Sequence, residues 1–196
     1  MVPSSENDPT FHILLNKVKF DEYTKDQSYT WAGTVAHEYT HALDFHGIAE
    51  KEGLSNCSTI EEMNIFSMFY QWTEYHARKK GYIFLRKFIE EISRMPSKNE
   101  QITHILNTEA PYQTKLYQSW YKAGTPEQRL YYTMQYLGRY SVWMDLFPTV
   151  FGKEKLMNYC PVMPWMWDVL MFLREHEELD DIYGHFEELN GILKCN

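Results

Sequence analysis

Cysteine is scarce in this sequence, and long basic and long apolar runs are missing from it. Only three of the 196 residues are cysteine, and none forms a C-x-x-C pair, which excludes a disulfide scaffold and a zinc ribbon. The longest basic run is Arg78-Lys79-Lys80 and the net charge is −8, so nucleic acid is not an expected partner. The longest apolar stretch, 162–173, falls short of the roughly 20 residues that span a bilayer.

The rest of the composition is typical of a folded domain. Hydrophobic residues make up 44% of the chain and aromatic residues 16%, which is enough to build a buried core. Residues 1–10 are polar and lack the apolar run of a secretory signal. We therefore expect a cytoplasmic protein in a reducing compartment, with no membrane partner.

The order of apolar residues predicts short strands followed by a long helix. The run at 11–16, continued in alternation by Val18 and Phe20, predicts one or two strands, and the polar residues 21–28 predict a linker. From about Tyr29, apolar residues recur at spacings of three or four, which predicts a helix that ends near Gly47.

Capping boxes mark further helix starts. In this pattern a serine or threonine and a glutamate or glutamine three residues later each satisfy a free backbone amide of the first turn. One at Ser58 and Glu61 predicts a second long helix, which ends at Gly81 or, with a bend, at Ile92. Two more predict a mostly helical second half: Ser97 with Glu100, and Thr125 with Gln128.

The first predicted helix contains His37-Glu38-Tyr39-Thr40-His41, an H-E-x-x-H motif. Residues four apart lie on one helix face, so His37 and His41 can both reach a single zinc ion. Glu38 lies beside them, where it can act as the general base of a metal-dependent hydrolysis. The alternative is a helix whose histidines face solvent or make ordinary hydrogen bonds in the core.

A catalytic zinc ion usually has three protein ligands and one open position, so a third ligand is expected. Glu74 of the second helix is the candidate, because it lies beside the apolar stripe and a buried carboxylate needs a cation. The alternative is an exposed glutamate, or one paired with Arg78 one turn later. His46 and His76 are reserve ligands.

At this point the chain resembles the gluzincin zinc peptidases, and its compact form is similar to the ImmA/IrrE-like peptidases of mobile elements. The resemblance rests on the H-E-x-x-H helix and on Glu74-Tyr75-His76-Ala77, which has the E-x-x-A form of the third-ligand segment, and it covers residues 11 to about 85. It implies one zinc ion held by His37, His41 and Glu74. Thermolysin-like members carry E-x-x-x-D, whereas Arg78 stands at the aspartate position here.

Two other zinc-peptidase classes fit less well. The metzincin pattern requires a histidine at position 47, where this chain has glycine, with His46 one residue early. The segment 180–184 has the D-x-x-Y-G form of the aspzincins, but it lies far along the chain in an acidic stretch. Asp44, three residues after His41, is a candidate to orient a ligating histidine, since metal-bound imidazoles usually donate their second N–H to a carboxylate or carbonyl.

These observations predict an α+β fold, mainly helical, with a small N-terminal edge sheet. We expect a zincin-like metal-binding core at 1–95 and a helical subdomain at 96–196, or one continuous domain. The predicted function is zinc-dependent hydrolysis of an intracellular protein or peptide, with Glu38 as the base. The alternative is a non-catalytic zincin scaffold that binds a protein partner.

A peptidase also needs a group that stabilises the oxyanion formed from the scissile carbonyl. A tyrosine or histidine of the second half can supply it, and the sequence does not rank the candidates. They are Tyr131, Tyr132, Tyr136, Tyr140 and His104.

Overall fold

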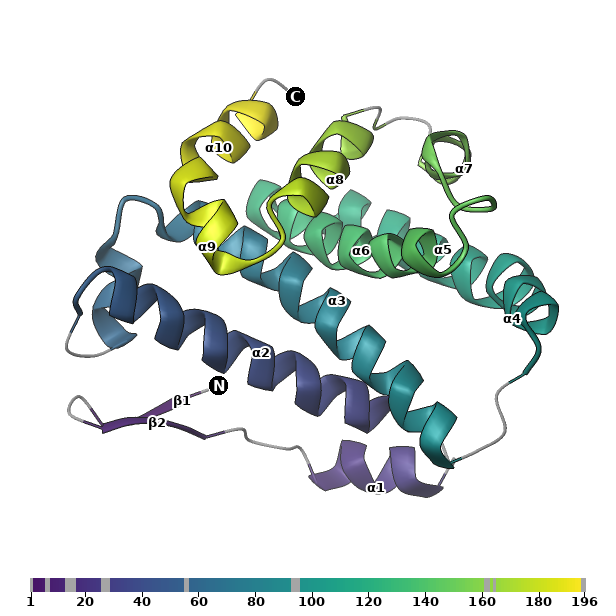
Figure 1. Ribbon diagram of the computed structural model, residues 1–196, viewed down its shortest axis with the longest axis horizontal. Helices are drawn as coiled ribbons and strands as arrows, with labels where there is room; N and C mark the ends of the chain where they lie inside the picture. The colour runs from purple at the N-terminus through teal and green to yellow at the C-terminus, as the bar shows by residue number, and fades with distance from the viewer. Residues whose placement is uncertain are drawn as a thin grey trace.

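The computed structural model describes residues 2–5, 8–12, 17–25, 29–54, 57–92, 96–160, 163 and 165–194. Helices build most of it (Figure 1). Their bounds are α1 Lys17–Lys25, α2 Thr30–Lys51, the 3₁₀ helix η1 Cys57–Glu62, α3 Phe66–Ile92, α4 Lys98–His104, the π-helical η2 Ile105–Glu109, α5 Ala110–Ala123, α6 Pro126–Leu146, α7 Lys153–Tyr159, α8 Met166–Glu175, α9 Leu179–Ile182, the 3₁₀ helix η3 Tyr183–His185 and α10 Phe186–Lys194.

The predicted α+β class is wrong, because the fold is all-α. Within the described ranges, paired strands are limited to an N-terminal hairpin of β1 (Val2–Ser5) and β2 (Asp8–His12), which pair antiparallel. A sheet contributes to a core only when its face packs broadly on other elements, and α2 packs mainly on α3 instead. The expected edge sheet beside the H-E-x-x-H helix is therefore replaced by helix-on-helix packing.

The prediction of a strand at Val18 and Phe20 is also wrong. Both residues belong to α1, which also occupies part of the predicted linker, and residues 13–16 lie outside the described ranges. Phe20 packs edge-on against Trp31 of α2, with ring centroids 5.5 Å apart, while Val18 is largely exposed. This one-sided burial fits a helix of nine residues. Two apolar residues in alternation are too few to distinguish a strand from such a helix.

Helix α2 continues one turn past Gly47 and ends in a Schellman motif. The N–H of Gly53 donates to the Glu50 carbonyl at 3.1 Å, and the N–H of Leu54 donates to the Ala49 carbonyl at 2.9 Å. Gly53 has φ = 64°, a conformation that is inexpensive only for a residue without Cβ. Gly53 is therefore the stop signal of this helix, and the prediction of Gly47 is corrected.

The capping boxes at Ser97 and Thr125 form as predicted, and they begin α4 and α6. The segment after Ser58 is instead the 3₁₀ helix η1, and α3 begins four residues after it at Phe66. Helix α3 then runs without interruption through Gly81 to Ile92. The predicted division at residues 95 and 96 stays a prediction.

Helix α3 is the centre of the fold and packs along α2 on one side and α6 on the other. Glycines allow both close approaches. A Cβ on Gly81 would lie 2.6 Å from the Gly33 carbonyl oxygen of α2, and one on Gly138 would lie 2.5 Å from the Tyr75 carbonyl oxygen of α3. The backbones therefore meet directly, which fixes the position of α2 relative to α3.

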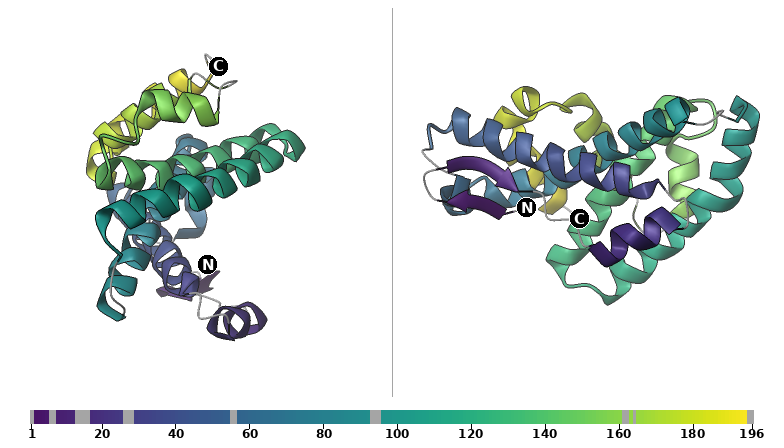
Figure 2. Two further views of the ribbon diagram at one scale, coloured as in Figure 1. Left: turned by 90° about the vertical axis from the view of Figure 1, so that its right-hand side faces the viewer. Right: turned by 90° about the horizontal axis from the view of Figure 1, so that it is seen from below.

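The C-terminal helices form a further layer, in which α8 packs on α6, α10 on α3 and α9 on α2. The left view of Figure 2 shows this layer above α3 and α6. Ion pairs connect this layer to the helices beneath it. The buried Lys79 of α3 pairs with Glu177, which lies between α8 and α9, at 2.5 Å and with Asp145 of α6 at 3.2 Å. The core beneath is aromatic, and its largest fully buried side chains include Trp72, Trp143, Tyr75, Tyr140, Phe69 and Phe151.

Candidate metal centre

His37 and His41 project from one face of α2 toward the same point. Their Nε2 atoms lie 3.1 Å apart, and the rings are nearly perpendicular, with centroids 4.5 Å apart. Both side chains are buried. The one-turn separation that the sequence spacing predicts therefore brings two imidazole nitrogens together in a region protected from solvent.

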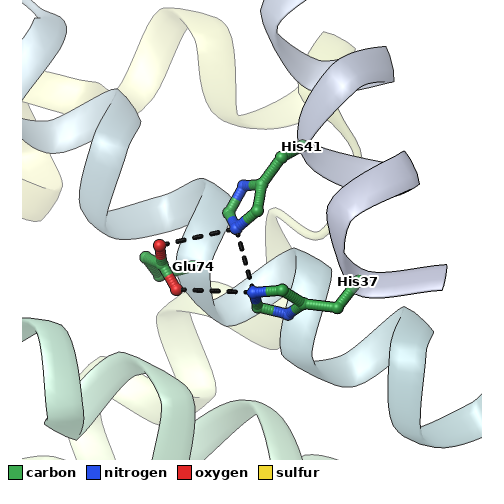
Figure 3. A group of neighbouring side chains, drawn as sticks. All are labelled: His37, His41 and Glu74. Atoms are coloured by element: carbon green, nitrogen blue, oxygen red, sulfur yellow. Dashed lines mark hydrogen bonds and ion pairs between the residues drawn. The ribbon is translucent and has the colours of Figure 1, made fainter. Parts of the chain in front are cut away.

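Glu74 of α3 completes a group of three donors (Figure 3). Its Oε1 lies 3.4 Å from Nε2 of His41, and its Oε2 lies 3.8 Å from Nε2 of His37. Nitrogen and oxygen ligands at roughly 2.0–2.1 Å from a tetrahedral zinc ion lie about 3.4 Å from one another, so the observed separations suit such an ion. Among the described residues this is the one group of its kind, and it can hold a metal ion.

A hydrogen-bonded relay orients His41. Its Nδ1 lies 3.0 Å from Oγ1 of Thr73, and that hydroxyl donates to Oδ2 of Asp44 at 2.5 Å. Because the hydroxyl has given its only proton to the carboxylate, it can act only as an acceptor toward the imidazole. The ring proton of His41 therefore sits on Nδ1, and the lone pair of Nε2 faces Glu74.

Asp44 thus lies behind one member of the group, at the place where a carboxylate supports a metal-binding imidazole. It also accepts a hydrogen bond from Nδ1 of His76, 3.0 Å from each carboxylate oxygen. His76 stacks on Trp72 and points away from Glu74 toward Glu178. His46 is half-exposed and lies 3.8 Å from Glu50. Neither reserve ligand joins the converging donors.

The electrostatic surroundings keep His37 neutral. Burial, followed by electrostatic interactions with Arg78 and with the neighbouring His41 ring, lowers the pKa of His37 to about 2, and the carbonyl of Ala77 offsets part of this shift. An imidazole must be unprotonated to bind a metal. The site therefore presents His37 in the form that a cation requires.

Glu74 is held from a third helix. Nε2 of Gln135, on α6, donates to Oε2 of Glu74 at 3.0 Å, and Nη2 of Arg78 donates to Oε1 of Gln135 at 2.8 Å. Arg78 therefore reaches Glu74 through an amide instead of pairing with it directly. Gln135 fixes one carboxylate oxygen and leaves the other toward His41.

Glu38 is half-buried beside the group, and its charge acts on Tyr70 of α3 and on Arg78. Tyr70 stacks on Tyr131 of α6, with ring centroids 6.4 Å apart. Burial, followed by the charge of Glu74, raises the pKa of both phenols. Two protonated hydroxyls, which can donate hydrogen bonds, therefore lie near Glu74 and Glu38.

The other candidate donors divide into two groups. Tyr136 and Tyr140 are buried in the core, where their hydroxyls pair with the Thr114 hydroxyl at 2.9 Å and the Gly152 carbonyl at 2.9 Å. Tyr132 and His104 line a cavity of about 700 Å³ that also reaches His37, and Tyr136 borders the same cavity while its hydroxyl is paired with Thr114. The first two are therefore structural, and Tyr131 has the position best suited to a role at the metal group.

The sequence does not identify Thr73, Gln135 or Tyr70 as site residues. Thr73 and Tyr70 stand at helical spacing on the apolar stripe of the second predicted helix, a position typical of core packing. A hydroxyl adjacent to a candidate ligand is the one signal that could have separated Thr73 from that stripe. Gln135 is 61 residues from Glu74, and nothing in the local sequence points to their contact.

The segment 180–184 does not contribute to the group, since Asp180 is exposed and pairs with Lys51 at 2.5 Å. None of the helices in the described ranges is both long and apolar enough to span a membrane. Comparison of the chain with models of protein families, with characterised proteins and with solved structures finds no match.

Proposed function

We propose that this chain is a zinc-dependent peptidase of intracellular proteins or peptides, with His37, His41 and Glu74 as metal ligands. The observation that carries the proposal is the convergence of three buried donors, one of them held by Thr73 in the tautomer that a metal requires. The H-E-x-x-H motif and its resemblance to gluzincin peptidases support the same conclusion.

Held by His37, His41 and Glu74, a zinc ion would supply a Lewis acid for polarising water and the scissile carbonyl. Glu38, the neighbour of His37, accepts the proton of the attacking water and returns it to the leaving amine. Its side chain is half-buried, so part of it stays accessible to a bound peptide. A metal site that served only for stability would have no use for a base at this place.

The two phenols beside Glu74 suit the oxyanion. Tyr131 is the first candidate, because it lies on α6, across the site from Glu38, which is on α2. Its raised pKa keeps the hydroxyl protonated at neutral pH, as a donor to a developing negative charge must be. Tyr70 is the second candidate and stacks on it.

Metal content and turnover in three variants test the proposal. We expect near-stoichiometric zinc in the wild type and its loss in both His37→Ala and Glu74→Ala. Glu38→Gln should keep the zinc and lose hydrolysis of a mixed peptide library by at least about a hundredfold. Retained zinc in Glu74→Ala would remove the third ligand, and unchanged turnover in Glu38→Gln would discard Glu38 as the base. A zinc-loaded wild type that hydrolyses no peptide of the library would favour the non-catalytic scaffold.

A further inference from the structure

The cavity beside the metal group extends well beyond it. It has a volume of about 700 Å³, and its walls come from α2 and α3 on one side and from α4, η2, α5 and α6 on the other. His37 and Arg78 line the end nearest the metal group, and Arg86 and Gln101 line it further along α3. A space of this size accommodates several residues of an extended peptide.

Positive charge is concentrated in this cavity. Three arginines line it, Arg78, Arg86 and Arg139, whereas Glu109 is the one carboxylate among its described lining residues. Glu109 is already neutralised, because Arg139 pairs with it at 3.1 Å and the Tyr82 hydroxyl donates to it at 2.8 Å. The chain as a whole has a net charge of −8, so the composition does not explain this local excess.

Two of the arginines, Arg78 and Arg86, form no ion pair with a carboxylate in the described part of the chain. Arg78 donates to the amide oxygen of Gln135 at 2.8 Å, and Arg86 donates to the amide oxygen of Gln101 at 2.5 Å. A guanidinium has five N–H donors, and an amide oxygen does not balance its charge. Burial and the charge of Arg139 lower the pKa of Arg78, and the charges of Glu74 and Glu38 offset part of this shift.

These arginines could serve only to tie helices together, as the bonds to Gln101 and Gln135 do. A neutral side chain would make such a tie without the cost of desolvating a charge. The placement of two such cations along one cavity wall, beginning one turn from Glu74, therefore points to an anionic ligand rather than to packing. Arginine also matches the planar geometry of a carboxylate.

We propose that the cavity binds a peptide through its carboxylate groups, which Arg78 and Arg86 receive. This inference rests on the proposed function and specifies its substrate class. Eight residues of α3 separate the two arginines, or about 12 Å of helix. An extended peptide covers that distance in three to four residues. The carboxylates come from acidic side chains with this spacing or, at one end, from a free C-terminus.

Four fluorescein-labelled peptides test the inference by fluorescence anisotropy with zinc-loaded Glu38→Gln protein. They combine two glutamates three residues apart, or two glutamines in their place, with a free or an amidated C-terminus. We expect the glutamate peptides to bind at least about tenfold more tightly than the glutamine peptides. Tighter binding of the free-acid glutamine peptide over its amide would identify the C-terminus as a second source of the carboxylate. Equal binding of all four peptides would overturn the inference.

Variants of the outer arginine assign the effect to the cavity. Arg86→Gln should reduce the preference for glutamate by about tenfold, and Arg86→Lys should keep part of it because the charge remains. Lys87→Gln is the matched control, since Lys87 is exposed, adjacent in sequence and absent from the cavity wall. An equal loss in Lys87→Gln would show a general effect of net charge and overturn the assignment.

The outcome can be separated from that of the proposed function. Peptide binding is measured without turnover, and the zinc content of each variant shows whether the metal group is intact. Equal binding of acidic and neutral peptides would remove the substrate class and leave the metal ligands and Glu38 unaffected. Unchanged turnover in Glu38→Gln would remove the peptidase mechanism and leave the binding preference measurable.

Discussion

Replacing Thr73 by valine removes one hydroxyl from the centre of the site and changes little else in shape. In the wild type that hydroxyl accepts from Nδ1 of His41 at 3.0 Å and donates to Asp44 at 2.5 Å. Valine can do neither, so the proton of His41 is free to move to Nε2. Metal binding then has to remove that proton from the ligating nitrogen, which weakens affinity.

The size of the effect follows from the bonds that are lost. Loss of a hydrogen-bond partner behind a ligating histidine costs about 10–100-fold in metal affinity, or about 1.4–2.7 kcal/mol. Asp44 keeps its contacts with His76, so the carboxylate is not left alone. The buried Nδ1–H of His41 loses its acceptor, and we expect the metal-free protein to lose about 1–3 kcal/mol of stability.

Competition with a chromophoric chelator measures the zinc affinity, and denaturant unfolding of the metal-free protein measures the stability. Thr73→Ser retains the hydroxyl and is the matched control, and we expect its zinc affinity to stay within about threefold of the wild type. A zinc affinity for Thr73→Val equal to that of Thr73→Ser would refute the relay as a determinant of metal binding.

Three further perturbations have defined outcomes. Gly81→Ala places a methyl group 2.6 Å from the Gly33 carbonyl oxygen and 3.1 Å from Cβ of His37. We expect denaturant unfolding to show a loss of about 1–3 kcal/mol in the free energy of unfolding, and zinc titration to show weaker metal binding. Gly191→Ala is the control and should show neither effect, because its methyl group meets nothing within 4 Å. Removal of zinc by a chelator should lower the melting temperature measured by calorimetry by roughly 5–10 °C, if the free zinc concentration was about a hundredfold above its dissociation constant. An unchanged melting temperature would mean that the group holds no metal under those conditions. Lys79→Met leaves Glu177 and Asp145 without their buried partner, so the free energy of unfolding measured with denaturant should fall by about 1–3 kcal/mol. The zinc content should stay unchanged, and a loss of zinc would show that these ion pairs also support the metal group.

The parts of the site that sequence predicts are those set by one helix. Four-residue spacing determines that His37 and His41 share a face, whatever packs against it. Burial of Glu74 follows from its position beside the stripe of α3, and the capping boxes at Ser97 and Thr125 depend only on neighbouring residues. The support from Gln135 depends on the α3 and α6 crossing, which no local pattern encodes.

The fold class failed for a related reason. A short apolar run such as 11–16 has no period of its own, so it suits a strand, a buried turn or a helix end equally. The fold class depends on which element packs against α2. That element is α3, and the two helices meet at Gly33 and Gly81. Small residues in one helix do not identify the helix that packs against them, so the sequence of α2 alone does not show that α3 covers this face.

Charge balance connects the metal group with the arginine-lined cavity. A divalent cation on two neutral imidazoles and the Glu74 carboxylate leaves a positive excess, and Arg78 adds to it one turn away on α3. Glu38 is the nearby compensating carboxylate. In the proposed mechanism, the proton that it accepts leaves a hydroxide behind, so the net charge of the site does not change. A substrate carboxylate received by Arg78, as proposed above, would oppose the remaining positive excess in a part of the protein where water screens little. The arginine four residues after Glu74, where thermolysin-like peptidases carry an aspartate, would therefore favour an acidic peptide next to the metal group.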